Sequence, residues 1–240
     1  MPSAQRPLYV ALGDSISIDE YAGGPGRGGA SLLFANRDDD FPEWRGRDLL
    51  TADPGTEFAL LATDGATTAT LLDAQLPRLA ARPAPMLVTL TIGGNDLLGA
   101  YGDTAAARRV ISRVGEAVDR ALPVLADRLA PSGRIVVGTV YDPSDGTGDA
   151  ARLGLPPWPD AVAVIAELND VLRRTARAHG ALVAEIAERF RGHGLSAGDP
   201  TRPEARPANR RQWYCRLIEP NAWGADGVRA AFWAALHPGG

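Results

Sequence analysis

Three short clusters of glycine and polar residues each follow an apolar run, and their residue types suit acyl-transfer chemistry. Ser15 ends a Gly-Asp-Ser turn, where its hydroxyl would project above a sheet as a nucleophile. Gly65 lacks a side chain, which would let its backbone N–H approach a ligand closely. Asn95 lies in Gly-Gly-Asn-Asp, and its amide could donate to a developing oxyanion. The three apolar runs span 8–12, 58–62 and 86–92.

Each of these residues also has a purely structural interpretation. Serine is a good helix N-cap, and the tripeptide alone favours that role for Ser15. Gly65 could simply make a turn, and Asn95 could cap a helix. Three such clusters in this order form a stronger signal than any one of them. Parallel strands bring their carboxyl ends to one edge, where ligands collect.

The elements that would position these residues alternate between strand and helix. We expect strands at 8–12, 58–62, 86–92, 134–141 and 181–186. Helical patterns run from Thr67 or Thr68 to about 76 and over 104–129, 159–179 and 221–236, and Pro123 should bend or interrupt the second. This alternation predicts an α/β fold with a doubly wound parallel sheet. Segments 19–41 and 192–211 are expected to be loops that wall the site or fold over it.

Composition narrows the possible partners. The chain has 240 residues, which favours a single domain over 1–240, and its net charge of −4 comes with no basic stripe for nucleic acid. No apolar run is long enough for a membrane span, and the first residues lack the apolar core of a signal peptide. With a single cysteine, these features predict a cytoplasmic protein. Aspartates at 142, 145 and 149 do not match a calcium loop, and we expect neither metal nor cofactor.

The three clusters together resemble the first three sequence blocks of the SGNH/GDSL hydrolases. The matching residues are Gly13-Asp14-Ser15-Ile16, the glycine of Asp64-Gly65-Ala66-Thr67-Thr68, and Gly93-Gly94-Asn95-Asp96. The resemblance implies a flavodoxin-like fold, with a five-stranded parallel sheet and helices on both faces, and hydrolysis of esters, thioesters or acyl groups on sugars. It further implies that Ser15 is the nucleophile. The oxyanion hole would comprise the backbone N–H groups of Ser15 and Gly65 and the side chain of Asn95.

The fourth block departs from this family. Its members carry Asp-x-x-His-Pro before the final helix, whereas this chain reads Arg216-Leu217-Ile218-Glu219-Pro220. Aligned in this way, Glu219 replaces the histidine and Arg216 replaces the aspartate. A carboxylate is a weaker base than imidazole unless burial raises its pKa, and Arg216 would act in the opposite direction. We expect Glu219 to be the base that activates Ser15.

The three histidines offer an alternative base. His193 follows the fifth expected strand and therefore lies at the active edge, where it could take part in catalysis or only order a loop. His179 ends a helix, where a cation is favoured by the helix dipole. His237 precedes a proline near the end of the chain but lacks the helix that should follow the family's His-Pro.

The resulting hypothesis is a serine hydrolase that acts on a small ester or acyl compound, with Ser15, Glu219, Gly65, Asn95 and His193 as candidate site residues. Two alternatives remain open. The fold could serve a non-ester reaction, such as ring opening, cyclisation or acyl transfer, or the protein could be a catalytically inactive binding protein. The sequence does not indicate the natural substrate, the acyl length or the oligomeric state.

Overall fold

The fold is built around a parallel five-stranded sheet with the strand order β2-β1-β3-β4-β5. The computed structural model describes residues 6–80, 86–201 and 211–238. Its strands are β1 (Leu8–Gly13), β2 (Glu57–Leu60), β3 (Met86–Thr91), β4 (Arg134–Gly138) and β5 (Leu182–Ala184). A separate antiparallel hairpin pairs β6 (Tyr214–Cys215) with β7 (Glu219–Pro220). The α/β class and the five parallel strands predicted from the sequence are confirmed.

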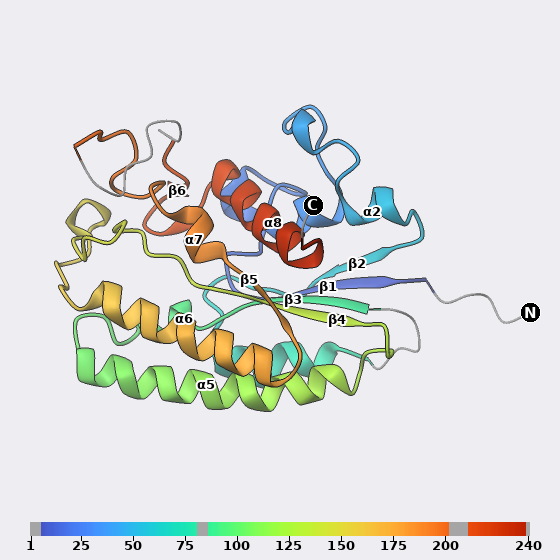
Figure 1. The fold of residues 1–240 in the computed structure, drawn as a ribbon, viewed down its shortest axis with the longest axis horizontal. Helices are drawn as coiled ribbons and strands as arrows, with labels where there is room; N and C mark the ends of the chain where they lie inside the picture. Colours follow the sequence, from blue (N-terminus) through green and yellow to red (C-terminus); the bar gives the residue numbers. More distant parts are fainter. Residues whose placement is uncertain (1–5, 81–85, 202–210, 239–240) are drawn as a thin grey trace, which may run out of the picture.

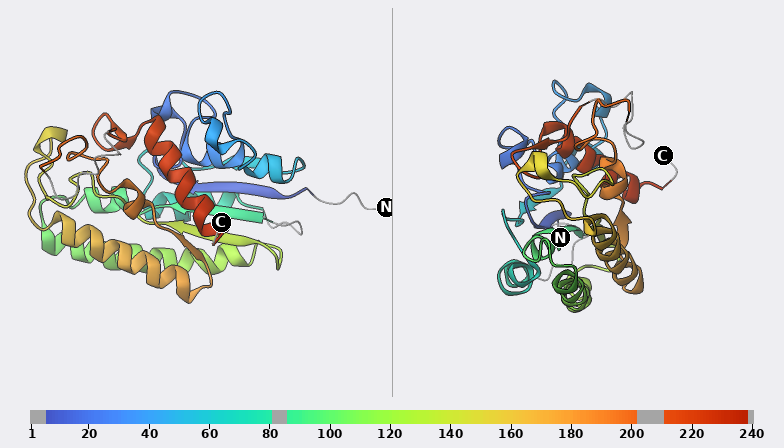
Figure 2. Two further views of the ribbon diagram at one scale, coloured as in Figure 1. Left: turned by 45° about the horizontal axis from the view of Figure 1, so that its top comes forward. Right: turned by 90° about the vertical axis from the view of Figure 1, so that its left-hand side faces the viewer.

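Helices cover both faces of this sheet (Figure 1). The longer ones are α5 (Thr104–Ala126), α6 (Ala161–Ala178) and α8 (Ala222–Leu236). The shorter ones are α1 (Gly29–Phe34), α2 (Leu49–Ala52), α3 (Thr68–Thr70), α4 (Gly94–Leu98) and α7 (Ile186–Phe190). Short 3-10 turns lie at Glu20–Ala22, Pro42–Trp44, Leu76–Arg78 and Ala151–Leu153, and a π-helical turn spans Leu71–Gln75. Figure 2 shows α5 and α6 together on one side of the sheet, with α1 and α8 on the other.

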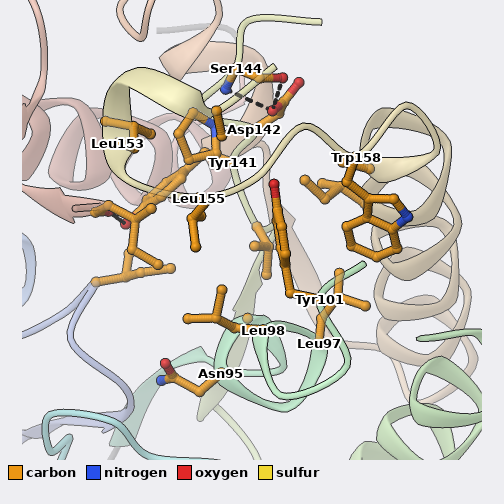
Figure 3. A pocket seen from close by; sticks show the side chains of 18 of the residues that line it. Asn95, Leu97, Leu98, Tyr101, Tyr141, Asp142, Ser144, Leu153, Leu155 and Trp158 are labelled. Atoms are coloured by element: carbon orange, nitrogen blue, oxygen red, sulfur yellow. Dashed lines mark hydrogen bonds between the residues drawn. The ribbon is translucent and has the colours of Figure 1, made fainter. Parts of the chain in front are cut away.

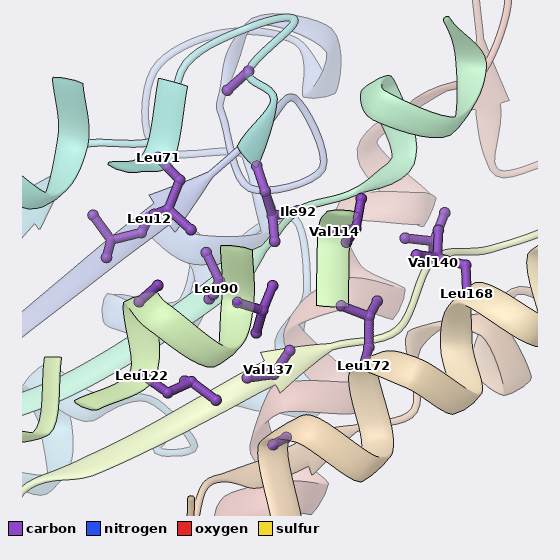
Figure 4. Close-up of a cluster of buried hydrophobic side chains, with 14 of the residues drawn as sticks. Leu12, Leu71, Leu90, Ile92, Val114, Leu122, Val137, Val140, Leu168 and Leu172 are labelled. Atoms are coloured by element: carbon purple, nitrogen blue, oxygen red, sulfur yellow. The ribbon is translucent and has the colours of Figure 1, made fainter. Parts of the chain in front are cut away.

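Strand β1 shows why the sheet is buried on both faces. Val10 and Leu12 belong to one core, between the sheet and α5 and α6 (Figure 4). Tyr9 and Ala11 belong to a second core on the opposite face, which includes residues of α1 and α8. Successive side chains of a strand point to opposite faces, so an uninterrupted apolar run supplies both cores.

Two expectations about the helices and loops are corrected. Pro123 does not interrupt α5, which continues to Ala126, although it ends within one turn of the proline. A proline in the last turn removes only one late helical hydrogen bond. Segment 19–41 is not merely loop, because it contains α1, whose Leu32 and Leu33 are fully buried. Part of segment 192–211, residues 202–210, lies outside the described residues.

The described part of the chain holds no helix that is both long and apolar enough to cross a membrane.

Candidate active site

Ser15 occupies a turn that the end of β1 makes possible. Gly13 has a φ of 114°, and a Cβ there would lie 1.8 Å from the carbonyl oxygen of Thr91. Glycine is therefore required for the chain to leave the sheet at this point. The Ser17 N–H donates to the Asp14 carbonyl at 3.1 Å and closes the turn that contains Ser15. Ser15 caps no helix, so its alternative interpretation as an N-cap is wrong.

Asn95 belongs to α4, directly after β3, and it ties this block to the one that contains Gly65. Its Nδ2 atom donates to the Ala66 carbonyl at 3.0 Å. The neighbouring Asp96 accepts from the backbone N–H of Thr68 at 3.0 Å and from its hydroxyl at 2.6 Å. These bonds hold the loops after β2 and β3 together. They also leave the second N–H of the Asn95 amide available for another acceptor.

The backbone donors implied by the family resemblance have no competing acceptor. Within the described part of the chain, neither the Ser15 nor the Gly65 N–H group is hydrogen-bonded. Gly65 is exposed, with a φ of 67°, whereas Ser15 is buried. Ser15 and Asn95 line the same pocket, and Gly65 lies next to the residue that Asn95 binds. Three such donors could stabilise a developing oxyanion.

Glu219 reaches Ser15 from the β6–β7 hairpin. In the hairpin register Cys215 pairs with Glu219, and the Asn221 side chain that follows accepts from the backbone N–H groups of Trp223 and Gly224. The same asparagine donates to the Tyr214 carbonyl at 3.3 Å, which joins the start of α8 to β6. These contacts fix the position of β7. Glu219 lies close enough to receive a hydrogen bond from the Ser15 hydroxyl.

Burial decides the electrostatics of Glu219. Desolvation raises the pKa of this carboxyl above its ordinary value, and the negative charge of Asp64 adds to the rise. The hydrogen bond from Ser15 and the positive charge of Arg216 act in the opposite direction but do not cancel it. Glu219 Oε2 is buried and has no hydrogen-bond partner among the described residues. An incompletely solvated carboxylate of this kind is a better base than one in water.

Arg216 lies at the solvent-exposed turn of the hairpin. It adopts a φ of 51°, in the left-handed region, and its guanidinium lies 5.3 Å from the centre of the Tyr21 ring. The Tyr21 hydroxyl donates to Asp64 at 2.9 Å. Arg216 therefore influences Glu219 as a nearby charge that is partly screened by solvent.

A second carboxyl group beside Ser15 was not singled out in the sequence. Asp14 is 2% exposed. Burial raises its pKa to about 7, the charge of Glu219 contributes to the rise, and hydrogen bonds with Thr91 and the Ile16 N–H oppose it. Two carboxyl groups whose charges disfavour each other thus flank the candidate nucleophile.

We expect Asp14→Asn to stabilise the protein at neutral pH. The folded state binds the Asp14 proton more tightly than the unfolded state, so stability falls as pH rises from about 4 to 7. Because asparagine does not ionise, the variant should have a free energy of unfolding that is higher than that of the wild type by at most about 4 kcal/mol at pH 8 and by little at pH 4. Urea unfolding at the two pH values measures the difference.

Asp145→Asn is the matched control for this prediction. Asp145 is also buried, but its carboxylate accepts hydrogen bonds from the N–H groups of Gly192, Gly194 and Ser196 and from the Ser196 hydroxyl. Its replacement should destabilise the protein, because buried donors lose a charged acceptor. A pH-independent loss of stability in Asp14→Asn would contradict the account of Asp14.

No histidine lines the pocket that contains Ser15. His193 is buried, stacks on Trp213 with ring centres 3.6 Å apart, and its Nδ1 lies 3.0 Å from the Arg211 carbonyl. His179 pairs with Asp119 at 2.7 Å, and His237 stacks on a tryptophan of α8. The structure therefore brings Ser15, Asn95 and Glu219 together and places the three histidines elsewhere.

The pocket beside Ser15 is a feature that the sequence did not indicate. Its volume is about 100 Å³, and its mouth is open to solvent. Figure 3 shows Asn95, Leu98 and Tyr101 on one side of it, with Tyr141, Leu153 and Leu155 facing them. The apolar residues scattered through the loop 141–158 were the available signal, but loop conformation decides which of them face inward.

The side chains of Asp142 and Asp145, which follow β4, accept hydrogen bonds from neighbouring parts of the protein. Asp142 accepts from the backbone N–H and hydroxyl of Ser144 and from the N–H of Gly146. Asp145, described above, accepts four hydrogen bonds from segment 192–196. These carboxylates order the loop that walls the pocket.

A family model described as the GDSL-like lipase/acylhydrolase family matches residues 11–228, nearly the whole chain. The chain belongs to this family. That Glu219 and Arg216 replace the histidine and aspartate of the family's fourth block remains a prediction from the sequence. The search of curated proteins returned no match.

Solved structures of esterases and lipases share the fold. An extracellular lipase from Streptomyces rimosus is 24% identical with a TM-score of 0.62, covering 95% of this chain and 99% of its own. A phospholipase A1 from Streptomyces albidoflavus NA297 is 23% identical with a TM-score of 0.61, covering 96% and 100%. The acetylxylan esterase Axe2 from Geobacillus stearothermophilus is 15% identical with a TM-score of 0.63, covering 98% and 95%. At these identities the similarity establishes the fold.

Proposed function

We propose that the protein is a serine hydrolase of small esters or related acyl compounds. Ser15 attacks the acyl carbon, and Glu219 accepts its proton. The N–H groups of Ser15 and Gly65 and the amide of Asn95 stabilise the oxyanion. The family membership supports acyl hydrolysis, and the contact between the Ser15 hydroxyl and the half-buried Glu219 is the observation that carries the mechanism.

Glu219 would serve in both halves of the reaction. As a carboxylate it accepts the Ser15 proton while the hydroxyl oxygen bonds to the acyl carbon. As a carboxylic acid it then protonates the leaving alcohol, and an acyl-enzyme remains. Water hydrolyses this intermediate with Glu219 again as the base. The raised pKa suits the role of base, because it makes the carboxylate more basic than an ordinary glutamate.

Labelling with a fluorophosphonate tests the nucleophile. We expect the probe to modify the wild-type protein and to leave Ser15→Ala unmodified. Absence of labelling in folded wild-type protein would favour the two alternatives, a non-ester reaction on this fold or an inactive binding protein.

The pH dependence of hydrolysis tests the base. Since Glu219 must be ionised to act, kcat/KM should fall as pH decreases through its raised pKa. This acid limb should therefore lie above the value of about 4.3 for an ordinary glutamate. Arg216→Gln removes a charge that lowers this pKa, so the limb should move to higher pH, and the movement should shrink at high salt. Two results together would contradict Glu219 as the base: an acid limb at the pKa of an ordinary glutamate, and no movement of that limb in Arg216→Gln.

A cytoplasmic location remains a proposal that rests on the sequence alone. One similar structure is an extracellular lipase, so the fold does not decide the compartment.

A further inference from the structure

Gly13, the last residue of β1, has an N–H group that the sheet does not pair. The N–H of the next residue, Asp14, donates to the Thr91 carbonyl of β3 at 3.0 Å. Because successive N–H groups of a strand point to opposite neighbours, the Gly13 N–H points toward β2, which has already ended at Leu60. A buried N–H group without an acceptor is costly, so another part of the chain must supply one.

The side chain of Gln75 pairs with both backbone groups of Gly13. Its Oε1 atom accepts from the Gly13 N–H at 2.8 Å, and its Nε2 atom donates to the Gly13 carbonyl at 2.8 Å. Nε2 also donates to the hydroxyl of Thr63, in the loop after β2, at 3.3 Å. Gln75 is 1% exposed, and its carboxamide thus uses both N–H groups and its oxygen within the protein.

The two residues that Gln75 binds precede the two backbone donors of the candidate oxyanion hole. Gly13 lies two residues before Ser15. Thr63 lies two residues before Gly65, and the Thr63 N–H itself donates to the Gly13 carbonyl at 3.0 Å. One buried carboxamide therefore joins the start of the nucleophile turn to the start of the loop that carries Gly65.

The backbone around Gln75 is shaped to make this contact. Gln75 ends the π-helical turn Leu71–Gln75, in which the Leu76 N–H donates to the Leu71 carbonyl, five residues earlier. Leu71 and Leu76 are buried in the same core as Leu12 of β1, and Figure 4 shows Leu71 and Leu12 in that core. Such π-helical turns are rare and are found frequently at functional sites. This one places both leucines in the core while the carboxamide meets the end of β1.

We propose that Gln75 is a positioning residue for the oxyanion hole. Its carboxamide holds the Ser15 and Gly65 N–H groups at the separation at which both donate to one oxygen of the tetrahedral intermediate. This inference rests on the proposed function, because it takes these N–H groups as the donors to that oxygen. A misplacement of about 1 Å in such a site can cost about 10²-fold in rate. Binding of the uncharged ester depends less on these donors, so loss of the carboxamide should lower kcat more than it changes KM.

Gln75→Met tests this role, because methionine has a similar length but cannot donate a hydrogen bond. With p-nitrophenyl acetate as the substrate, kcat should be at least about tenfold lower than in the wild type, and KM should change less than about threefold. Circular dichroism establishes folding, and thermal unfolding measures the stability that the variant loses.

Asn169→Leu is the matched control, because Asn169 makes the same pair of hydrogen bonds at a different strand. Its Oδ1 atom accepts from the Val140 N–H and its Nδ2 atom donates to the Val140 carbonyl, both at 2.7 Å. Asn169 is also buried, but Val140 follows β4, which leads to no candidate catalytic residue. Asn169→Leu should lose stability to a similar extent, since it also leaves buried backbone groups unpaired, and should keep kcat within a few fold.

Gln75→Glu provides a readout that a loss of stability alone would not produce. A protonated carboxyl group can accept from the Gly13 N–H and donate to the Gly13 carbonyl, as the amide does, whereas an ionised one cannot donate. Burial can raise the pKa of a glutamate to about 8–9. In folded protein, kcat relative to the wild type should therefore be at least about tenfold higher at about pH 6 than at about pH 9. If Gln75→Met does not fold, this pH dependence carries the test.

The outcomes distinguish this inference from the proposed function. A lowered kcat in Gln75→Met but not in Asn169→Leu, together with the pH dependence of Gln75→Glu, would support the positioning role. An equal loss of kcat in Gln75→Met and Asn169→Leu, or a pH-independent wild-type kcat in Gln75→Glu, would overturn that role and leave the proposed function in place. Wild-type protein that neither hydrolyses an ester nor reacts with a fluorophosphonate would refute both.

Discussion

Glu219→Gln is expected to abolish ester hydrolysis as completely as Ser15→Ala, while the fold remains intact. The amide preserves the shape of the side chain but cannot accept the Ser15 proton. A positioned general base typically contributes 10²–10⁴-fold, and here it would act at two proton transfers, so we expect a loss of at least about 10³-fold in kcat. The measurement is kcat on an activated ester, with circular dichroism to establish folding.

Glu185→Gln is the matched control for the base. Glu185 is also half-buried but pairs with Arg173 at 2.7 Å after β5, away from the pocket, and its replacement should leave kcat nearly unchanged. Glu219→His combined with Arg216→Asp should restore ordinary ester hydrolysis, because it rebuilds the family's pair. If Glu219→Gln kept full activity and His193→Ala lost it, the base would be His193.

Asn95→Ala is expected to lower kcat by on the order of 10²-fold or more, the usual cost of losing one oxyanion donor. The amide strengthens its interaction only when negative charge develops on the substrate oxygen, so KM should change much less. Steady-state kinetics on an ester for which chemistry limits the rate measure the two constants separately.

Thr68→Val controls for the structural role of Asn95. Asn95 also binds the Ala66 carbonyl, so its loss could loosen the contact between the loops after β2 and β3. Thr68→Val weakens the same contact by removing the hydroxyl bond to Asp96 while keeping the oxyanion donor. It should retain kcat within a few fold. An unchanged kcat in Asn95→Ala would rule out the assigned role.

Much of the fold could be predicted because its signals are local. The apolar runs of the strands supply two cores at once, so their burial is evident in the sequence. Thr67 caps the helical segment that begins with α3, as its type and position suggested. By contrast, α1 has only six residues, and it depends on α8, since a Cβ at Gly29 would lie 2.6 Å from Val228. A short helix that is stabilised by packing against another helix shows no periodic apolar pattern in its own sequence.

The sequence motifs predicted which residues belong to the candidate site, but not the burial and the neighbouring charges of those residues. Strand ends placed Ser15 and Asn95 on one edge, and the structure puts both in one pocket. The pKa of Glu219 depends on how deeply a two-residue strand is buried and on the distances to Asp64 and Arg216. The spacing of residues in the sequence encodes neither. His193 follows the fifth strand as expected, yet its ring packs on Trp213 rather than toward Ser15.

The pairing of Ser15 with Glu219 is the central claim, and the rate of fluorophosphonate labelling tests it without knowledge of the natural substrate. Mass spectrometry of the adduct should place the probe on Ser15 in the wild type and in His193→Ala. Labelling of Glu219→Gln should be at least about 10²-fold slower, because serine loses its proton acceptor. Labelling of Glu219→Gln at the wild-type rate, with His193→Ala unreactive, would contradict the account.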